Sequence, residues 1–92
     1  MKEETQKRIF ELLEPVVEFI KKELGVDAKP TIFRGYYGAI KTDLIVEEQT
    51  KLNKFLENNE EVQVFSYDEI WLKSKYIVFS FTIDGKWSHA WE

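Results

Sequence analysis

The chain has 92 residues, which suits a single domain over residues 1–92. It contains no cysteine and one histidine, which excludes thiol catalysis and metal sites built from several such ligands, so we expect no cofactor and no metal. The net charge is −4 and only two of the 13 basic residues are arginines, a composition that disfavours direct binding of nucleic acid.

The N-terminal segment predicts an amphipathic helix over residues 3–24. Apolar residues recur at helical spacing from Ile9 to Leu24, and Gly25 is suited to end the helix. Pro15 removes one backbone hydrogen bond, so we expect a kink or two short helices there. The charged N-terminus does not resemble a signal peptide, and no apolar run reaches the roughly 18–20 residues of a membrane span. We therefore expect a cytoplasmic protein with no membrane partner.

The segment after this helix is the least regular part of the chain. We expect a connector over residues 26–30, then a strand, a turn and a second strand. Periodicity leaves residues 42–46 open between the end of a strand and the start of a helix. Within FRGYYG, Arg34 can bind a carboxylate or phosphate, and Tyr36 and Tyr37 are of a type enriched at protein interfaces. The alternative is a hairpin whose aromatic residues belong to its strands.

The second half of the chain predicts one helix followed by strands. Residues 47–59 contain good helix formers with apolar residues on one face. From Val62 onward, β-branched and aromatic residues predict an antiparallel meander, interrupted at residues 73–75 and again at Asp84-Gly85. The order α-β-β-α-β-β-β predicts a two-layer α+β fold with both helices packed on an antiparallel sheet.

Three residues near the C-terminus alternate along the last predicted strand and so share one face: Trp87, His89 and Trp91. A two-residue turn pairs Thr82 with Trp87 and turns this stripe away from the core. A three-residue turn, with Gly85 as a bulge, pairs Phe81 with Trp87 and places the stripe on the core face. We favour the three-residue turn, because it gives one apolar and one mostly polar face. The other register would create a second apolar face for a partner or a pocket.

The histidine, serine and acidic residues of the chain do not form a recognisable catalytic pattern. His89 is the only imidazole, and one register sets Ser80 opposite it. We reject a catalytic pair, because catalytic serines lie on sharp turns beside oxyanion donors and Ser80 lies within a strand. Neighbouring acidic residues at 47–48, 60–61 and 68–69 are typical of solvated surface charge. We therefore expect no enzymatic activity.

Trp71, in DEIWLKSK, is a second interface candidate. If its neighbours Ile70 and Leu72 belong to the core, Trp71 points outward, as the anchor of an interface would. The candidate partner-binding residues are therefore Arg34, Tyr36, Tyr37, Asp68, Glu69 and Trp71.

A short, acidic, cysteine-free α+β chain with exposed aromatic candidates resembles the small inhibitors that phages and toxin-carrying bacteria encode, such as anti-defence and toxin-immunity proteins. The resemblance implies a stoichiometric, non-catalytic binder that covers a functional site, often basic or nucleic-acid-handling, on a larger protein. Two alternatives stay open. One is a small-molecule binder or enzyme with a helix–sheet pocket near His89. The other is a homodimeric structural module or a designed protein.

Overall fold

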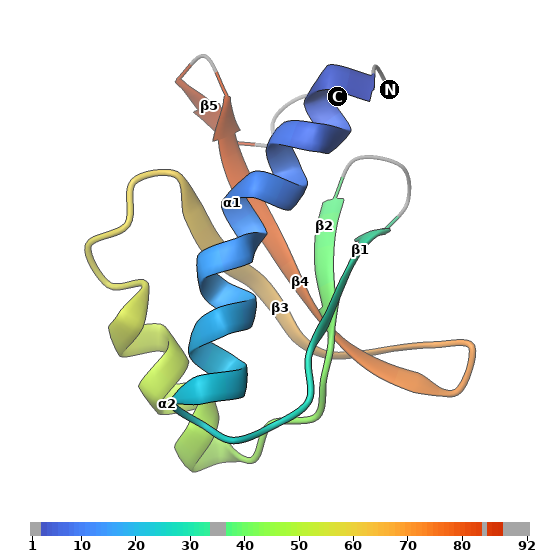
Figure 1. Ribbon diagram of the computed structural model, residues 1–92, viewed down its shortest axis with the longest axis vertical. Coiled ribbons are helices and arrows are strands. Elements are labelled where there is room, and N and C mark those ends of the chain that lie inside the picture. The colour runs from blue at the N-terminus through green and yellow to red at the C-terminus, as the bar shows by residue number, and fades with distance from the viewer. Residues whose placement is uncertain (1–2, 34–36, 84, 88–92) are drawn as a thin grey trace.

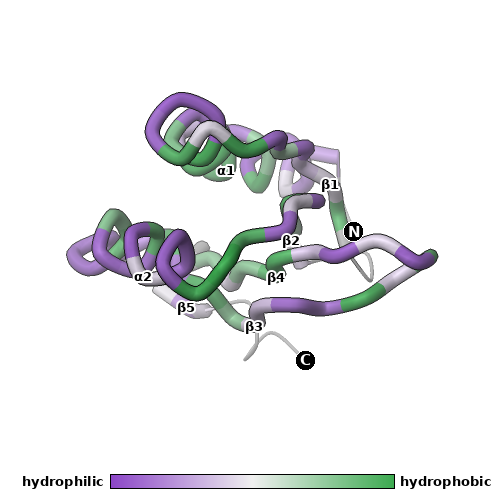
Figure 2. Tube along the Cα trace, turned by 90° about the horizontal axis from the view of Figure 1, so that it is seen from below, coloured by the Kyte–Doolittle hydropathy of each residue, from purple (hydrophilic) through white to green (hydrophobic). Residues whose placement is uncertain are grey.

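A computed structural model of the chain describes residues 3–33, 37–83 and 85–87. In chain order its elements are α1 (Glu3–Lys22), β1 (Lys29–Phe33), β2 (Tyr37–Lys41), α2 (Val46–Phe55), β3 (Val62–Trp71), β4 (Ser74–Ile83) and β5 (Lys86–Trp87). This is the predicted order, and the α+β prediction is confirmed. α1 lies across one face of the sheet, and α2 lies near β3 (Figures 1 and 2). Neither helix in the described ranges is long and apolar enough to cross a membrane.

The strands form one antiparallel sheet in the spatial order β1-β2-β4-β3, and β5 pairs with the end of β4. β4 is therefore the central strand, with β2 on one side and β3 on the other. The β2 register ends at Lys41 opposite Tyr76, and one further backbone hydrogen bond, from the amide of Thr42 to the carbonyl of Lys75 (3.2 Å), closes this side; Ser74 pairs only with β3. The β3–β4 hairpin consequently extends beyond β1 and β2, as Figure 1 shows.

α1 is a single helix that runs through Pro15, so the expectation of two short helices is wrong. Pro15 lies on the exposed side of α1, where water can satisfy the backbone carbonyl that loses its hydrogen bond. The helix ends at Lys22, two residues before the predicted end. Gly25 acts as the predicted stop, with a φ of +69°, and the next amide, of Val26, donates to the carbonyl of Ile20 (3.2 Å).

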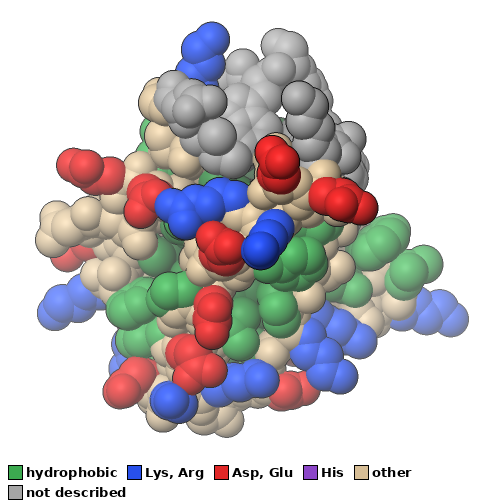
Figure 3. All heavy atoms as spheres, turned by 45° about the horizontal axis from the view of Figure 1, so that its top comes forward, with side chains coloured by type: hydrophobic (Ala, Val, Ile, Leu, Met, Phe, Trp, Pro, Cys, Tyr) green, Lys and Arg blue, Asp and Glu red, His purple; other side chains and the backbone are tan. Residues whose placement is uncertain are grey.

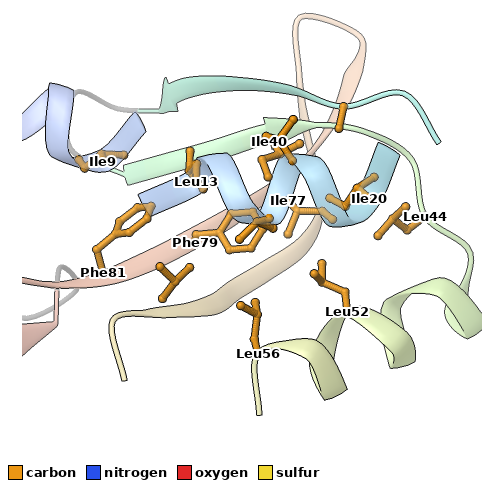
Figure 4. Packing of buried hydrophobic residues seen from close by; sticks show 14 residues of the cluster. Ile9, Leu13, Ile20, Ile40, Leu44, Leu52, Leu56, Ile77, Phe79 and Phe81 are labelled. Atoms are coloured by element: carbon orange, nitrogen blue, oxygen red, sulfur yellow. The ribbon is translucent and has the colours of Figure 1, made fainter. Parts of the chain in front are cut away.

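The main core lies between α1, α2 and the sheet face that they cover (Figure 4). Phe79 and Phe81 of β4 are fully buried there beside Ile9 and Leu13 of α1. Phe81 and Ile9 can pack closely against β2 because residue 38 is a glycine. A Cβ at that position would overlap the ring of Phe81 and lie 2.7 Å from Cγ2 of Ile9.

The connections differ from the predicted boundaries by a few residues. Residues 42–45 are neither strand nor helix, and α2 begins at Val46. Leu44 in this connection is buried in the core, which explains its apolar character outside any regular element. α2 ends at Phe55 rather than at residue 59, and the β3–β4 turn lies at Leu72-Lys73 rather than at residues 73–75.

The favoured register of the last hairpin is wrong. Thr82 pairs with Trp87 and Ile83 with Lys86, as a two-residue turn requires, and Gly85 has a φ of +79°. The sequence favours the three-residue turn because it separates an apolar sheet face from a mostly polar one. That preference assumes that only one face of the sheet is apolar. The sheet instead buries apolar residues on its second face too, in a small cluster of Ala39, Tyr76 and Val78 packed by Tyr37. Trp87 therefore lies on the face away from Phe81, whereas His89 and Trp91 lie outside the described residues.

Candidate protein-binding surface

Among the residues that the structure describes, most of the aromatic side chains that the core does not use lie on the sheet face opposite the helices. Side chains alternate along a strand, so the neighbours of core residues Ile40 and Phe81 point to this second face. We call this surface the aromatic face; it consists of Tyr37, Phe65, Trp71, Tyr76 and Trp87. The structure thus places two of the predicted partner-binding residues, Tyr37 and Trp71, on the same sheet face as Trp87 of the C-terminal stripe, with Trp71 and Trp87 beside opposite ends of β4.

Ring contacts connect the strands across the aromatic face. Tyr37 of β2 stacks on Phe65 of β3 with ring centroids 5.4 Å apart, so the pair reaches across β4 between them. Trp71 lies against Tyr76 with ring centroids 5.9 Å apart in a tilted arrangement. Tyr76 is buried, but Phe65 is 53% exposed and Trp71 is 45% exposed. These two rings combine a fixed position with accessible surface.

The surface continues onto the projecting end of the β3–β4 hairpin, residues 69–75, which we call the hairpin arm. Ile70 is 70% exposed and Leu72 is 75% exposed, so the condition that they belong to the core, from which an outward Trp71 was to follow, is not met. The reason is that the arm extends past the β1–β2 part of the sheet (Figure 1). Trp71 is nevertheless exposed, as expected. The arm therefore ends in three consecutive accessible apolar side chains.

The turn at the tip of the arm has an unfavourable backbone conformation for its sequence. Leu72 and Lys73 have φ values of +50° and +62°. Two-residue hairpin turns of this kind favour Asn-Gly, and a side chain with a Cβ loses roughly 1–2 kcal/mol per residue in the left-handed region. Backbone strain of this kind is often found at functional positions. Stability alone therefore does not account for a leucine at the tip.

Two irregularities in β3 determine which residues reach this surface. One extra residue of β3 lies between the pairs Val64–Phe79 and Ser66–Val78, and another lies before the pair Glu69–Tyr76. Each is a bulge that interrupts the alternation of side chains. Asp68 lies within the second bulge and has a φ of +60°.

Sequence reasoning missed Phe65, Ile70 and Leu72 as surface residues. The alternation of Val62 and Val64 was a usable signal for Phe65, because the residue after an inward-facing valine faces outward. No comparable signal existed for Ile70 and Leu72, since their exposure depends on how far the arm extends past β2.

The charged residues beside the arm have both signs. Asp68 is exposed, and the carboxylate of Glu69 accepts a hydrogen bond from Ser66 Oγ (3.0 Å). Lys73 and Lys75 on the same arm are also exposed. The expected acidic pair is thus present beside Trp71, but one of its members is held by a neighbouring side chain. Arg34 and Tyr36 lie outside the described residues.

The ionisable groups with displaced pKa values have structural explanations. Burial raises the pKa of Tyr67 to about 12, and its hydroxyl donates to Asn53 Oδ1 (2.6 Å). A mutual hydrogen bond lowers the pKa of Glu18 and raises that of Lys22 on the exposed side of α1. Within the described ranges, no three acidic or histidine side chains gather as metal ligands would.

Clefts lie at two places on the described surface that bear on ligand binding. One, of about 430 Å³, lies between the ends of α1 and α2, where Phe19 stacks on Phe55 with ring centroids 4.2 Å apart. The other, of about 540 Å³, lies where β1 and β2 meet the hairpin arm. Trp87 lines neither cleft, so neither is the pocket considered for the C-terminal stripe.

Comparison of the chain with protein-family models, with curated proteins and with solved structures gives no match.

Proposed function

We propose that the protein is a small, non-catalytic protein-binding module that acts as a stoichiometric inhibitor of a larger cytoplasmic protein. The observation that carries this proposal is the hairpin arm with its accessible apolar tip, Ile70, Trp71 and Leu72. Ile70 and Trp71 point to opposite faces of the arm, so its end offers apolar contacts on both sides. Large exposed apolar side chains gathered in one place are typical of interaction sites, and tryptophan is among the residues that contribute most to binding. The absence of cysteine fits a reducing compartment.

The shape of the arm supports a partner with a concave site. A projecting tip buries its side chains in a groove, whereas two identical tips offer each other little area. A stable interface buries about 800 Å² on each partner, so we expect the neighbouring aromatic face, with Phe65, to contribute as well. The net charge of −4 favours a partner whose groove has a basic border, as a nucleic-acid-handling site would have.

The test compares two apolar surfaces of the same chain. In the arm variant, Trp71→Ala is combined with Leu72→Asn. In the control variant, Ile45→Ser is combined with Val46→Ser, because these side chains are 63% and 77% exposed at the start of α2, away from the arm. The wild-type chain is used to capture a partner from its native host, and the purified partner is then titrated with each variant by calorimetry and assayed for its activity.

We expect a one-to-one complex that inhibits the partner. The arm variant should bind at least about a hundredfold more weakly, as is usual for the loss of a tryptophan anchor, while the control variant binds like wild type. Equal binding by the arm variant would contradict the proposal. A chain that light scattering shows to be an obligate dimer, with no one-to-one partner complex, would favour the homodimer instead.

A further inference from the structure

The cleft of about 540 Å³ is rich in lysine although the chain as a whole is acidic. It lies where the connector after α1, the paired ends of β1 and β2, and residues 73–75 of the hairpin arm meet. The charged groups that line it are Asp27, Lys29, Lys41, Asp43, Lys73 and Lys75. Positive groups therefore outnumber negative ones here, whereas the net charge of the chain is −4. Figure 3 shows one group of Lys and Arg side chains (blue) at the lower right, besides others spread over the rest of this view.

Three of these lysines have no ion-pair partner among the residues that the structure describes. Lys75 Nζ lies 3.4 Å from Asp43 Oδ1, and the described residues form no other ion pair in the cleft. Lys29, Lys41 and Lys73 form none within it. The four lysines of the lining are thus balanced by only two carboxylates, one of which is paired with Lys75.

The sheet itself brings two of the lysines together. Lys29 and Lys41 are direct cross-strand partners in the β1–β2 register. Side chains in this relation have Cβ atoms about 5 Å apart, and like charges placed there are destabilising. A hydrogen bond from Thr42 Oγ1 to the backbone carbonyl of Asp27 (2.8 Å) holds the adjoining walls of the cleft together. Strand pairing therefore sets the two like-charged side chains opposite each other, and their proximity does not depend on a loop conformation.

We propose that this cleft binds a small ligand that carries at least two phosphate groups. A bound anion would relieve the repulsion between Lys29 and Lys41, and the spread of lysines over two walls suits more than one anionic group. Lysine binds phosphate as a point charge, whereas planar carboxylates are better matched by the fork of arginine, which is absent from the lining. The volume of about 540 Å³ lies within the range of small-molecule sites. Lys73 follows Leu72 directly in the turn, but the apolar side chains of the tip, Ile70, Trp71 and Leu72, are not part of the cleft lining, so this proposal goes beyond the inhibitor function.

Inorganic pyrophosphate is the probe for the test, and the full chain is titrated with it by calorimetry and by amide chemical shifts. We expect saturable one-to-one binding with shifts concentrated at residues 27–29 and 41–43. The double variant Lys29→Gln/Lys41→Gln should bind about a hundredfold more weakly, because each charge-assisted hydrogen bond contributes about tenfold or more. The matched control Lys21→Gln/Lys51→Gln, which changes two exposed lysines on the helices, should bind like wild type.

Several results would overturn the proposal. Unchanged affinity in the Lys29→Gln/Lys41→Gln variant would mean that binding occurs elsewhere. Citrate binding as tightly as pyrophosphate would contradict the phosphate preference. Tighter binding of a single-stranded oligonucleotide, which pyrophosphate fails to displace, would indicate a nucleic-acid surface instead. The Trp71→Ala/Leu72→Asn variant should keep its affinity for pyrophosphate, so failure here and failure of the inhibitor proposal are distinguishable.

Discussion

At the scale of single residues, Tyr67 is the clearest example of a polar group that the fold holds in place. Its ring lies between β3 and α2, and its hydroxyl donates to Asn53 Oδ1 (2.6 Å) and lies 3.2 Å from the carbonyl oxygen of Gln49. Burial raises the pKa of this phenol to about 12, from an ordinary value of 10.0. The neutral form is therefore the one that the folded state favours.

This displaced pKa predicts how stability depends on pH. Below pH 10 the phenol is protonated in both states, so Tyr67 adds no pH dependence. Between pH 10 and 12 the unfolded chain loses the proton first, so the free energy of unfolding falls as pH rises. Because the side chain is only half-buried, we expect a loss of about 1–2 kcal/mol rather than the full value of a two-unit shift.

Urea unfolding of wild type and Tyr67→Phe across pH 7–12 checks this prediction. At pH 7 the variant should be less stable by about 1 kcal/mol, because it lacks the hydrogen bond to Asn53. Above pH 10 the difference between the two proteins should shrink or reverse. A constant difference up to pH 12 would mean that burial does not displace the titration of Tyr67.

At the scale of elements, the β3–β4 turn predicts a conflict between stability and binding. Replacing Leu72-Lys73 with Asn-Gly supplies the residues that tolerate the observed φ values of +50° and +62°. We expect the free energy of unfolding to rise by about 1 kcal/mol, even though an apolar side chain is lost. The same change should weaken partner binding, since it removes Leu72 from the tip.

The control for this prediction is Leu72→Ala, which shortens the side chain but keeps the strained backbone. It should leave the free energy of unfolding within about 0.5 kcal/mol of wild type, because Leu72 is 75% exposed. Stability that rises equally in both variants would show that the gain comes from removing an exposed leucine and not from the turn conformation.

The elements themselves could be predicted from the sequence because each has a strong periodic signal. α1 has apolar residues at helical spacing, and β4 combines β-branched and aromatic residues over its whole length. Bulges and turn lengths have no such signal, and each shifts every following side chain to the other face. The register at Trp87 and the exposure of Ile70 therefore came only from the structure, while Tyr37 and Trp71 could be identified from residue type.

At the scale of the whole molecule, apolar groups are buried on both faces of a single sheet. The main core lies under the helices, and Ala39, Tyr76 and Val78 form a second cluster on the other face. A chain of 92 residues buries a smaller fraction of its surface than a larger domain does, so a second cluster adds stability that one thin core lacks. The cluster is continuous with the aromatic face, because Tyr76 belongs to both and its ring contacts Trp71.

Charge is distributed unevenly over the same molecule, and this unevenness gives a prediction that links stability to ligand binding. Lys29→Glu converts the like-charged cross-strand pair with Lys41 into an opposite-charged one. We expect the free energy of unfolding to rise by about 0.5 kcal/mol at low salt, because opposite charges in this relation attract. Pyrophosphate binding should be lost at the same time, since the change removes one ammonium group and adds a carboxylate to the cleft.

The salt dependence of this effect separates charge from packing. At 1 M salt the Debye length is about 3 Å, so the stability gained by Lys29→Glu should largely disappear. Lys21→Glu makes the same charge change in the last turn of α1, where a negative group is unfavourable, so it should lower stability while pyrophosphate still binds. If Lys29→Glu instead lowers the free energy of unfolding, or keeps its gain at 1 M salt, repulsion between Lys29 and Lys41 is not a property of the unliganded protein. The lysine-lined cleft would then lack the built-in repulsion that favours an anionic ligand.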